Sequence, residues 1–579
     1  MFGYIYKFIK FSKNQRKNMI LSLVFGFFKS VFNAASILSS AYVLNKIIDN
    51  EVSNKTIYIS LGIILVGILG GFICSYFGTQ MQTIAGYTTA ANARIRIAER
   101  LKYTPMGYFN EHNLGQITKT ATNSATILQE TLTRCMLLSV QGLLTTIVIN
   151  IAMFIFDWRI GMITLAGLIL FLIVNKFLHK AGDSLSIKRS DSIENAVESV
   201  LEYVQGISEI KSYNLVGDSN EKVRNAIKQE NELSFKMEKA YIPFMSLQNL
   251  VTKLTSIVIV LAAVIFTIDG SMELGNTLMV AISSFMIYEE LAQGGNMSAL
   301  LRSASISIDE INNAMNMPSM NDGGKTIRPT SSKITVKNVD FSYDKKKILN
   351  NINLEIKPKS TLAIVGGSGS GKTTLCNLLI RFWDPDKGVI SLGDNDIKEY
   401  TLDSLLKNYS MVFQNVYLFN DTIANNIRFG KPNATIEEIR EAAKKACCDE
   451  FIMELPNGYD TIIGEGGASI SGGEKQRISI ARAIIKDSPI IILDEATANV
   501  DPENEYLLQR AIKELTKEKT VIMIAHRLKT VRNADKIIVI ENGQIVEEGS
   551  HDDLIKLNKA YAGFINMKEQ AVGWKLGRK

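Results

Sequence analysis

The feature that most constrains this chain is a long stretch without charge, because no Asp, Glu, Lys or Arg occurs from Thr56 to Ala93. A helix needs about 20 mostly apolar residues to cross the roughly 30 Å hydrocarbon core of a bilayer. The stretch is long enough to do so. We therefore expect a membrane-spanning helix here, with the lipid bilayer as the partner of this part of the chain.

Further apolar segments predict a helical membrane unit with six spans. The expected spans are roughly residues 18–45, 57–86, 136–156, 159–178, 243–268 and 276–299. The N-terminus is basic, and no small-residue cleavage site follows it. We therefore expect a retained first helix after a short interfacial helix, and not a cleaved signal peptide.

The segments between the expected spans alternate in length and in charge. Spans 1–2, 3–4 and 5–6 are joined by short loops, and the last of these, Asp269–Asn276, contains no Lys or Arg. Long segments rich in Lys and Arg separate spans 2–3 and 4–5. The positive-inside rule then places both termini and both long segments in the cytoplasm of a multi-pass protein of the cytoplasmic membrane. We expect the long segments to be helices that leave the membrane and end at a soluble domain.

A change in composition predicts two domains. Residues 316–332 are rich in Pro, Gly and Ser, as linkers are, so we expect an all-α transmembrane domain over residues 1–315 and a soluble α/β domain over residues 333–579. The formal net charge of +6 in 579 residues is too small to indicate nucleic-acid binding. The five cysteines form no C-x-x-C pair, so neither a zinc site nor a disulfide framework is expected.

The soluble half contains a complete phosphate-binding motif, G-x-x-x-x-G-K-[ST], between a strand-like and a helix-like segment. Its residues, with the next one along the chain, are Gly366, Gly367, Ser368, Gly369, Ser370, Gly371, Lys372, Thr373 and Thr374. The glycines let backbone N–H groups close around phosphates, and the following helix adds its dipole. We expect Lys372 to reach the β- and γ-phosphates of ATP and Thr373 to bind Mg²⁺.

A second apolar segment, Ile490–Leu493, precedes two acidic residues. Asp494 at the end of such a strand can hold Mg²⁺, directly or through water, and Glu495 can polarise the attacking water. Four aliphatic residues before Asp-Glu are a weak pattern alone. The same pattern after a phosphate-binding loop indicates an ATPase.

The segment Ile470-Ser471-Gly472-Gly473-Glu474-Lys475-Gln476-Arg477 resembles the L-S-G-G-Q signature of the ABC (ATP-binding cassette) transporter family. The resemblance extends from about Ile334 to Leu557. It implies that Ser471, Gly472, Gly473 and Glu474 contact ATP, although Glu474 stands where the family usually has Gln and Ile470 where it has Leu. Because Ser-Gly-Gly is intact, we expect activity to survive.

Other positions carry family roles over by the same resemblance. Tyr343 resembles the aromatic residue that stacks on adenine, and Gln414 resembles the loop glutamine that contacts Mg²⁺ and signals to the membrane domain. Asp501 resembles the aspartate that couples two ATP sites, although Asn499-Val500 replaces the common Ala-Leu before it. His526 resembles the switch histidine at the γ-phosphate. Glu495, His526 and Gln414 are therefore the expected catalytic residues.

The membrane half also resembles the exporter-type fold of this family, on Pro105–Phe109, Gly115-Gln116-Ile117 and Asp157-Trp158-Arg159. In the family, the P-loop of one domain faces the signature of another. One P-loop and one signature therefore imply a half-transporter that couples ATP hydrolysis to alternating access and needs a second half-transporter, with a heterodimer favoured. Substrate, direction and partner are left open. The alternative is an importer of siderophore-type substrates. A soluble nucleic-acid-remodelling ATPase and an ATP-gated channel are less consistent with the chain.

The charged residues inside the expected spans include Lys29, Lys253, Glu289 and Glu290. At 1.5 Å per residue, all four lie at a similar depth below the outer face. Charges at that depth are costly unless they face a cavity or one another. They are either structural or interfacial charges, or contacts to a polar substrate.

Overall fold

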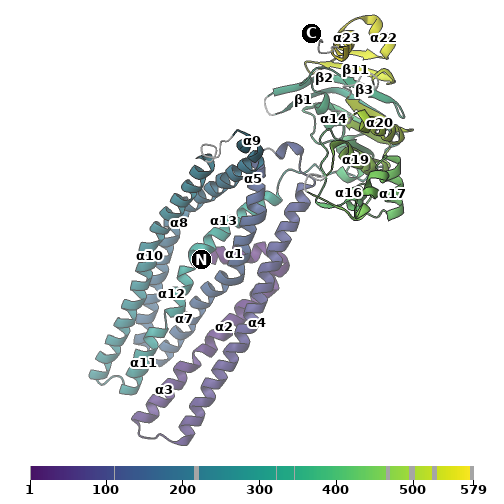
Figure 1. Ribbon diagram of the computed structural model, residues 1–579. Coiled ribbons are helices and arrows are strands. Elements are labelled where there is room, and N and C mark those ends of the chain that lie inside the picture. The colour runs from purple at the N-terminus through teal and green to yellow at the C-terminus, as the bar shows by residue number, and fades with distance from the viewer. Residues whose placement is uncertain are drawn as a thin grey trace. The chain divides into compact units, whose positions relative to one another are not determined.

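The computed structural model describes residues 2–109, 111–213, 221–320, 323–343, 346–464, 470–494, 502–524 and 531–573 (Figure 1). The chain divides into two compact units. A helical unit contains Met1–Lys102 and Tyr108–Met317, and an α/β unit contains Tyr103–Gly107 and Pro318–Lys579.

Long helices make up most of the helical unit (Figure 1). The N-terminal half contains α1 (Phe2–Phe11), α2 (Arg16–Asn33), α3 (Ala35–Ile48), α4 (Asn54–Leu101), α5 (Glu111–Lys119), α6 (Ala125–Glu130) and α7 (Met136–Phe156). The remainder contains α8 (Trp158–Gln205), α9 (Ile207–Ser212), α10 (Glu221–Ile268), α11 (Leu274–Met286), α12 (Glu289–Asn296) and α13 (Ser298–Met315). The helices α4, α8 and α10 have 48 residues each, or roughly 70 Å at 1.5 Å per residue, more than twice the hydrocarbon thickness of a bilayer.

Among the described residues, five helical segments are long and apolar enough to cross a membrane: Lys13–Ile48, Asn54–Leu101, Gly115–Phe156, Trp158–Gly182 and Glu221–Ile268. The sixth expected span, residues 276–299, is also largely helical but is not one continuous helix. The chain there divides between α11 and α12 at Ile287 and Tyr288. Glu289 and Glu290 lie in the first turn of α12, where the helix dipole favours negative charge, so they suit the start of a new helix better than the middle of a long one.

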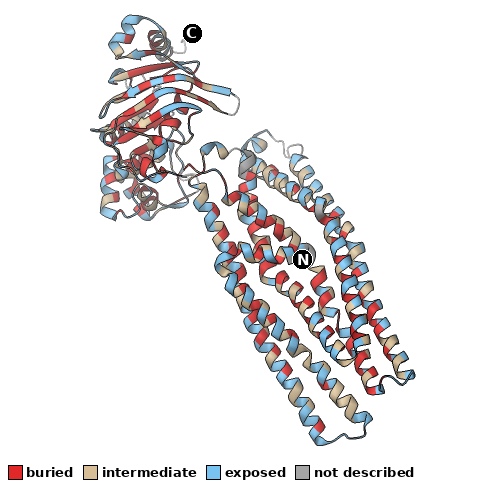
Figure 2. Cartoon of the chain, turned by 180° about the vertical axis from the view of Figure 1, so that it is seen from behind, coloured by how far each residue is buried: buried red, intermediate tan, exposed pale blue. Residues whose placement is uncertain are grey.

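Burial separates an inner from an outer side of these helices (Figure 2). Leucine, isoleucine, valine and phenylalanine side chains are exposed on α2, α3, α4, α8 and α10, as expected for surfaces that face lipid. Small residues let the helices approach closely on the inner side. A Cβ atom at Gly142 of α7 would lie 2.2 Å from the Glu290 carbonyl oxygen of α12, so the helix–helix contact there requires glycine.

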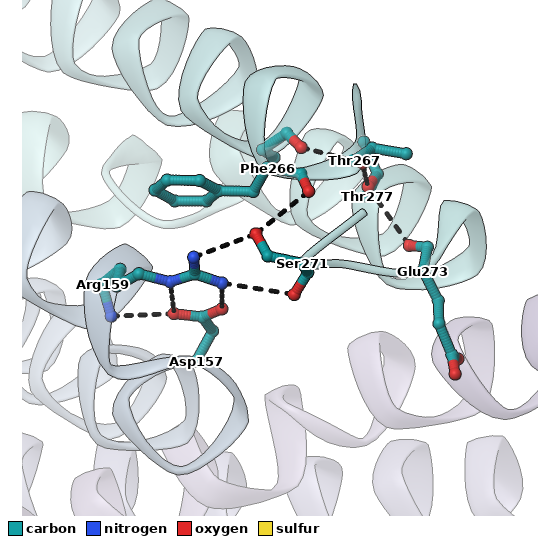
Figure 3. Close-up of polar contacts among 8 residues, drawn as sticks. Asp157, Arg159, Phe266, Thr267, Ser271, Glu273 and Thr277 are labelled. Carbon is teal, nitrogen blue, oxygen red and sulfur yellow. Dashed lines mark hydrogen bonds and ion pairs between the residues drawn. The ribbon is translucent and has the colours of Figure 1, made fainter. Parts of the chain in front are cut away.

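A compact polar cluster ties the α7–α8 turn to the loop between α10 and α11 (Figure 3). Asp157 caps α8 by accepting a hydrogen bond from the Arg159 backbone N–H at 2.8 Å and pairs with the Arg159 guanidinium at 2.8 Å. The same guanidinium donates to Ser271 Oγ at 3.0 Å and lies 3.9 Å from the centre of the Phe266 ring. The side-chain hydrogen bond from Arg159 holds the pKa of Asp157 below its usual value.

The α/β unit contains two large sheets. The strands are β1 (Ile334–Tyr343), β2 (Lys346–Ile356), β3 (Thr361–Val365), β4 (Lys387–Leu392), β5 (Asn395–Asp396), β6 (Tyr409–Val412), β9 (Ile490–Asp494), β10 (Thr520–Ile524), β11 (Lys536–Glu541) and β12 (Gln544–Gly549). Four strands pair in the order β2-β1-β4-β5, and six in the order β12-β11-β3-β10-β9-β6. The strands β11, β3, β10, β9 and β6 are parallel and deeply buried, which is typical of sheets covered by helices on both faces.

The segment Tyr103–Gly107 belongs to the α/β unit although it follows α4 in sequence. Tyr103 donates a hydrogen bond to the Asp403 carboxylate at 2.7 Å, and the Met106 N–H donates to the Phe382 carbonyl at 3.1 Å. A Cβ atom at Gly107 would lie 2.6 Å from Trp383 Nε1. The segment therefore packs on the surface of this unit, and its glycine gives the tryptophan room.

Candidate functional site

The glycine-rich loop connects the buried strand β3 to helix α14 (Lys372–Leu379). Gly371 has φ +106°, a conformation that favours glycine. A Cβ atom at Gly366 would lie 2.3 Å from the Ile540 carbonyl oxygen of β11. The loop is thus held against the neighbouring strand, with the N-terminus of α14 opening onto it. Such a helix start has free N–H groups and a positive dipole end, as anion binding requires.

Two side chains of the loop fit a phosphate ligand. Lys372 is 7% exposed, and its ammonium donates to the Gly366 and Gly367 carbonyl oxygens at 3.0 and 2.6 Å, so it lies over the loop. The buried Ser370 hydroxyl has no hydrogen-bond partner among the described residues. A phosphate oxygen would satisfy this donor. The structure therefore brings the predicted loop residues together at the start of α14, in surroundings that suit an anion.

The order of the parallel strands brings the other candidates to the same edge of the sheet. Asp494 ends β9 and Gln414 follows β6, and both strands run parallel to β3 with β10 between β3 and β9. Burial raises the pKa of the Cys376 thiol on α14, and the Asp494 carboxylate raises it further. Asp494 therefore lies close enough to α14 to act on it electrostatically.

Three predicted residues, Glu495, Asp501 and His526, lie outside the described residues. The strands that lead to two of them lie within the described residues. Asp494 ends β9 immediately before Glu495, and Ile524 ends β10 two residues before His526. Both strands end at the same edge of the sheet as the phosphate-binding loop.

The signature residues form the start of α19 (Gly472–Lys486). Ser471 is the N-cap, and its side chain and that of Glu474 form a capping box: Glu474 accepts from the Ser471 N–H at 2.7 Å. Either Glu or Gln can occupy this position of a capping box, so the departure from the usual Gln keeps the helix start intact. Gln476, one helical turn from Gly472, donates to the Gln414 carbonyl at 2.9 Å and so links the signature helix to the Gln414 loop.

Tyr343 lies at the end of β1, partly buried in an aromatic cluster. Its ring contacts Phe341 edge-on at 4.9 Å and Trp383 at 5.4 Å between centroids. No sequence motif indicates that Trp383 is a neighbour of Tyr343, because the two residues are 40 positions apart and share no motif.

The four charged residues of the membrane region differ in their surroundings. Glu290 accepts hydrogen bonds from Asn33 Nδ2 at 3.2 Å and Thr145 Oγ1 at 2.5 Å, and Thr145 in turn contacts Ser30 at 2.8 Å. Asn33 is the last residue of α2, so this cluster joins two helix interruptions, at α2–α3 and α11–α12. Among the described residues, the side chains of Lys29, Lys253 and Glu289 make no ion pair or hydrogen bond. The structure therefore shows direct polar contacts for Glu290 and not a common cluster of four charges.

Two family models match the chain. The ABC transporter transmembrane region matches residues 19–288, and the ABC transporter domain matches residues 349–498. An ATP-dependent lipid A-core flippase of Syntrophus aciditrophicus is 33% identical over 536 residues, covering 90% of this chain and 87% of the relative. Another ATP-dependent lipid A-core flippase, from Desulfotalea psychrophila, is 30% identical over 555 residues, covering 95% of this chain and 97% of the relative.

A solved structure of a bacterial Atm1-family ABC exporter with ATP bound has the same fold, with a TM-score of 0.87, 24% identity and coverage of 98% of this chain and 99% of that chain. The full-length relatives and this fold favour the exporter over the siderophore importer that the sequence left as an alternative. The chain belongs to the ABC transporter family and is a half-size, ATP-hydrolysing exporter of that family.

Proposed function

We propose that this chain, paired with a second half-transporter, uses ATP and Mg²⁺ to move a lipid with a large polar head across the cytoplasmic membrane. The observation that supports this most is the identity of 30% or more with lipid A-core flippases along nearly the whole chain. Such an extent includes the membrane helices, where substrate is selected, as well as the ATPase domain.

The residues at the edge of the six-stranded sheet fit Mg²⁺. The hydroxyl of Thr373, the carboxylate of Asp494 and the amide oxygen of Gln414 are the hard oxygen ligands that this ion prefers. Ser370 supplies a further buried hydroxyl without a partner among the described residues. When bound, Mg²⁺ would neutralise charge that develops on the phosphates. Lys372 would orient the phosphates, Glu495 would polarise the attacking water, and His526 would contact the γ-phosphate.

The second half-transporter would complete each ATP site. Ser471, Gly472 and Gly473 of one chain would face the P-loop of the other, with Glu474 capping the signature helix. Asp501 would couple the two sites, and Tyr343 would stack on adenine. The heterodimer stays a prediction, and ATP hydrolysis by the purified chain alone is its direct test.

Charge supports one orientation of the membrane domain. The long stretches between the second and third and between the fourth and fifth spans, residues 87–135 and 179–242, carry most of the Lys and Arg of the helical region, and the α10–α11 loop has none. We therefore place both termini and the ATPase unit in the cytoplasm. In this orientation the Asp157–Arg159–Ser271 cluster of Figure 3 lies on the outer side.

Glu290 is the strongest of the four proposed substrate residues, because its cluster with Asn33 and Thr145 lies where two spans are interrupted. Polar groups inside a membrane protein are costly and commonly mark a substrate pathway. We include Lys29, Lys253 and Glu289 in the same proposal on the strength of their expected depth.

The test is transport in vesicles reconstituted with the purified chain, together with its second half-transporter where the chain alone does not hydrolyse ATP. A fluorescent lipid A analogue should become protected from, or exposed to, an impermeant quencher only when ATP is present, and Lys372→Ala should abolish the change. Glu290→Gln should lower lipid-stimulated ATP hydrolysis and leave basal hydrolysis intact. ATP-dependent movement of a small water-soluble dye in place of the lipid would refute the proposed substrate class.

A further inference from the structure

A pocket lies at the N-terminal end of the helical unit. It lies where the turn after α1 meets α4, and it is a small cleft open to solvent, with enclosed room for about one water-sized group. Its lining includes Ser12, Lys13, Thr89, Asn92 and Arg96. No carboxylate is among its lining residues. The pocket lies within one unit of the structure.

Two hydroxyl groups at this pocket are buried without partners. Ser12 is 3% exposed and Thr89 is 6% exposed, and neither side-chain oxygen has a hydrogen-bond partner among the described residues. Leaving a hydroxyl buried and unpaired costs free energy. The backbone of Ser12 is satisfied, since its N–H donates to the Phe8 carbonyl at 2.9 Å and its carbonyl accepts from Gln15 at 2.8 Å. The missing hydrogen bond at Ser12 is therefore that of its side chain, which lines the pocket.

Two cations stand on the exposed part of the lining. Lys13 and Arg96 are exposed, and within the described parts of the chain neither forms an ion pair. Asn92 adds an amide group between Thr89 and Arg96 on the same helix. A lining of hydroxyl, amide, ammonium and guanidinium donors without a carboxylate suits an anion. A water molecule could satisfy the two hydroxyls, but it would make no use of the two cations.

The pocket also lies at the level of a membrane surface. On α2 the exposed apolar residues begin at Ile20, eight residues after Ser12. On α4 the exposed residues Ile84 and Tyr87 precede Thr89, and charges begin at Arg94. Tyrosine is enriched at the headgroup level of membranes. Both helices thus change from lipid-facing to polar at the pocket, where phospholipid phosphates lie.

We propose that this pocket binds the phosphate of an anionic phospholipid from the leaflet on the N-terminal side. One phosphate oxygen accepts hydrogen bonds from Ser12 and Thr89, and the ionic charge is balanced by Lys13 and Arg96 at the mouth. The site anchors the turn between α1 and α2 to α4. It is separate from the ATP site and does not depend on which substrate is transported.

The experiment uses the full-length chain, purified in detergent and stripped of lipid, with phosphatidylglycerol and phosphatidylcholine of identical acyl chains as probes. Bound lipid per chain and the thermal unfolding midpoint are measured. Wild type should retain phosphatidylglycerol more strongly, because the quaternary ammonium of phosphatidylcholine is repelled by the two cations. Ser12→Ala with Thr89→Val, and separately Lys13→Gln with Arg96→Gln, should each weaken retention by roughly tenfold or more, since each removes hydrogen bonds to a charged group.

The matched control is Lys10→Gln with Lys17→Gln, which removes two exposed cations of the same segment that do not line the pocket. Retention by this control should stay within about twofold of wild type. Without lipid, Ser12→Ala with Thr89→Val should unfold no earlier than wild type, because it removes two unsatisfied groups.

Four results would overturn the proposal. Equal retention of the two lipids, or equal loss in the control variant, would reduce the effect to general surface charge. Wild-type retention by Ser12→Ala with Thr89→Val would show a pocket filled by water. An equal thermal shift with millimolar inorganic phosphate alone would assign the site to a free anion and not to a lipid.

Discussion

A buried ion pair in the helical unit allows a quantitative prediction. Lys119 of α5 is 4% exposed, and its ammonium lies 2.9 Å from Glu310 Oε1 of α13 and 3.6 Å from Glu194 Oε2 of α8. It also donates to the Ser190 carbonyl and hydroxyl at 2.9 and 2.7 Å. The pair therefore joins three helices that are distant in sequence.

Glu310→Gln should destabilise the protein by about 2–4 kcal/mol. Removing one partner of a buried pair costs about 3–5 kcal/mol because it leaves an uncompensated charge. Glu194, at 3.6 Å and 26% exposed, compensates part of that charge. Adding Lys119→Met removes the stranded charge, so the double variant should be more stable than Glu310→Gln alone.

The assay is thermal unfolding of the full-length chain in detergent, for wild type, both single variants and the double variant. Glu202→Gln is the control, because Glu202 and Lys222 form an ion pair with both side chains about two-thirds exposed, and such pairs contribute about 0–1 kcal/mol. Equal lowering of the midpoint by Glu310→Gln and by the control would contradict the buried ion pair, as would simply additive effects of the two single variants.

Three further predictions follow from local contacts. Glu474→Gln should keep ATP hydrolysis within about twofold, whereas Glu474→Ala should slow it, because only Gln preserves the capping box; steady-state phosphate release measures both. Burial opposes ionisation of Glu310, but hydrogen bonds from Ser124, Ser190 and Lys119 outweigh it and lower its pKa. The stability that the Glu310 carboxylate contributes should be fully present above its ordinary pKa of 4.5 and decline as pH falls below that value. Thermal unfolding at pH 3–7 measures this decline, which should be absent in Glu310→Gln. The side-chain hydrogen bond from Arg159 lowers the pKa of Asp157 from 3.8. The contribution of Asp157 to stability should therefore decline as pH falls below about 3.8. In the same pH series, Asp157→Asn should remove this dependence.

The parts of the ATP site that sequence predicts are those carried by contiguous motifs. The glycines from Gly366 to Gly371 predict the phosphate-binding loop directly, because the same few residues supply both the phosphate contacts and the backbone conformation of the loop. Ser471 and Glu474 are similarly local, since a capping box spans one helical turn. These predictions need no knowledge of how distant segments pack.

The features that sequence does not reveal depend on distant partners. Lys119 and Glu310 are 191 residues apart, and Asn33 and Glu290 are 257 apart. Hydropathy also treats residues 276–299 as one span, because it averages over the break between α11 and α12. Gly142 of α7 packs against the chain at this break, and Glu289 and Glu290 begin the helix that follows it. Pairing across such separations is a property of the packed unit and leaves no periodic signal in the chain.

Mixed dimers test whether each ATP is held between the P-loop of one chain and the signature of another. Two differently tagged copies allow dimers of defined composition to be purified, with Lys372→Ala disabling the P-loop and Ser471→Arg disabling the signature. If the sites are shared, placing the two changes in different copies leaves one intact site, and placing both in one copy beside a wild-type chain leaves none. Substantial ATP hydrolysis by the first dimer and almost none by the second is the predicted result, and the reverse pattern would contradict the account.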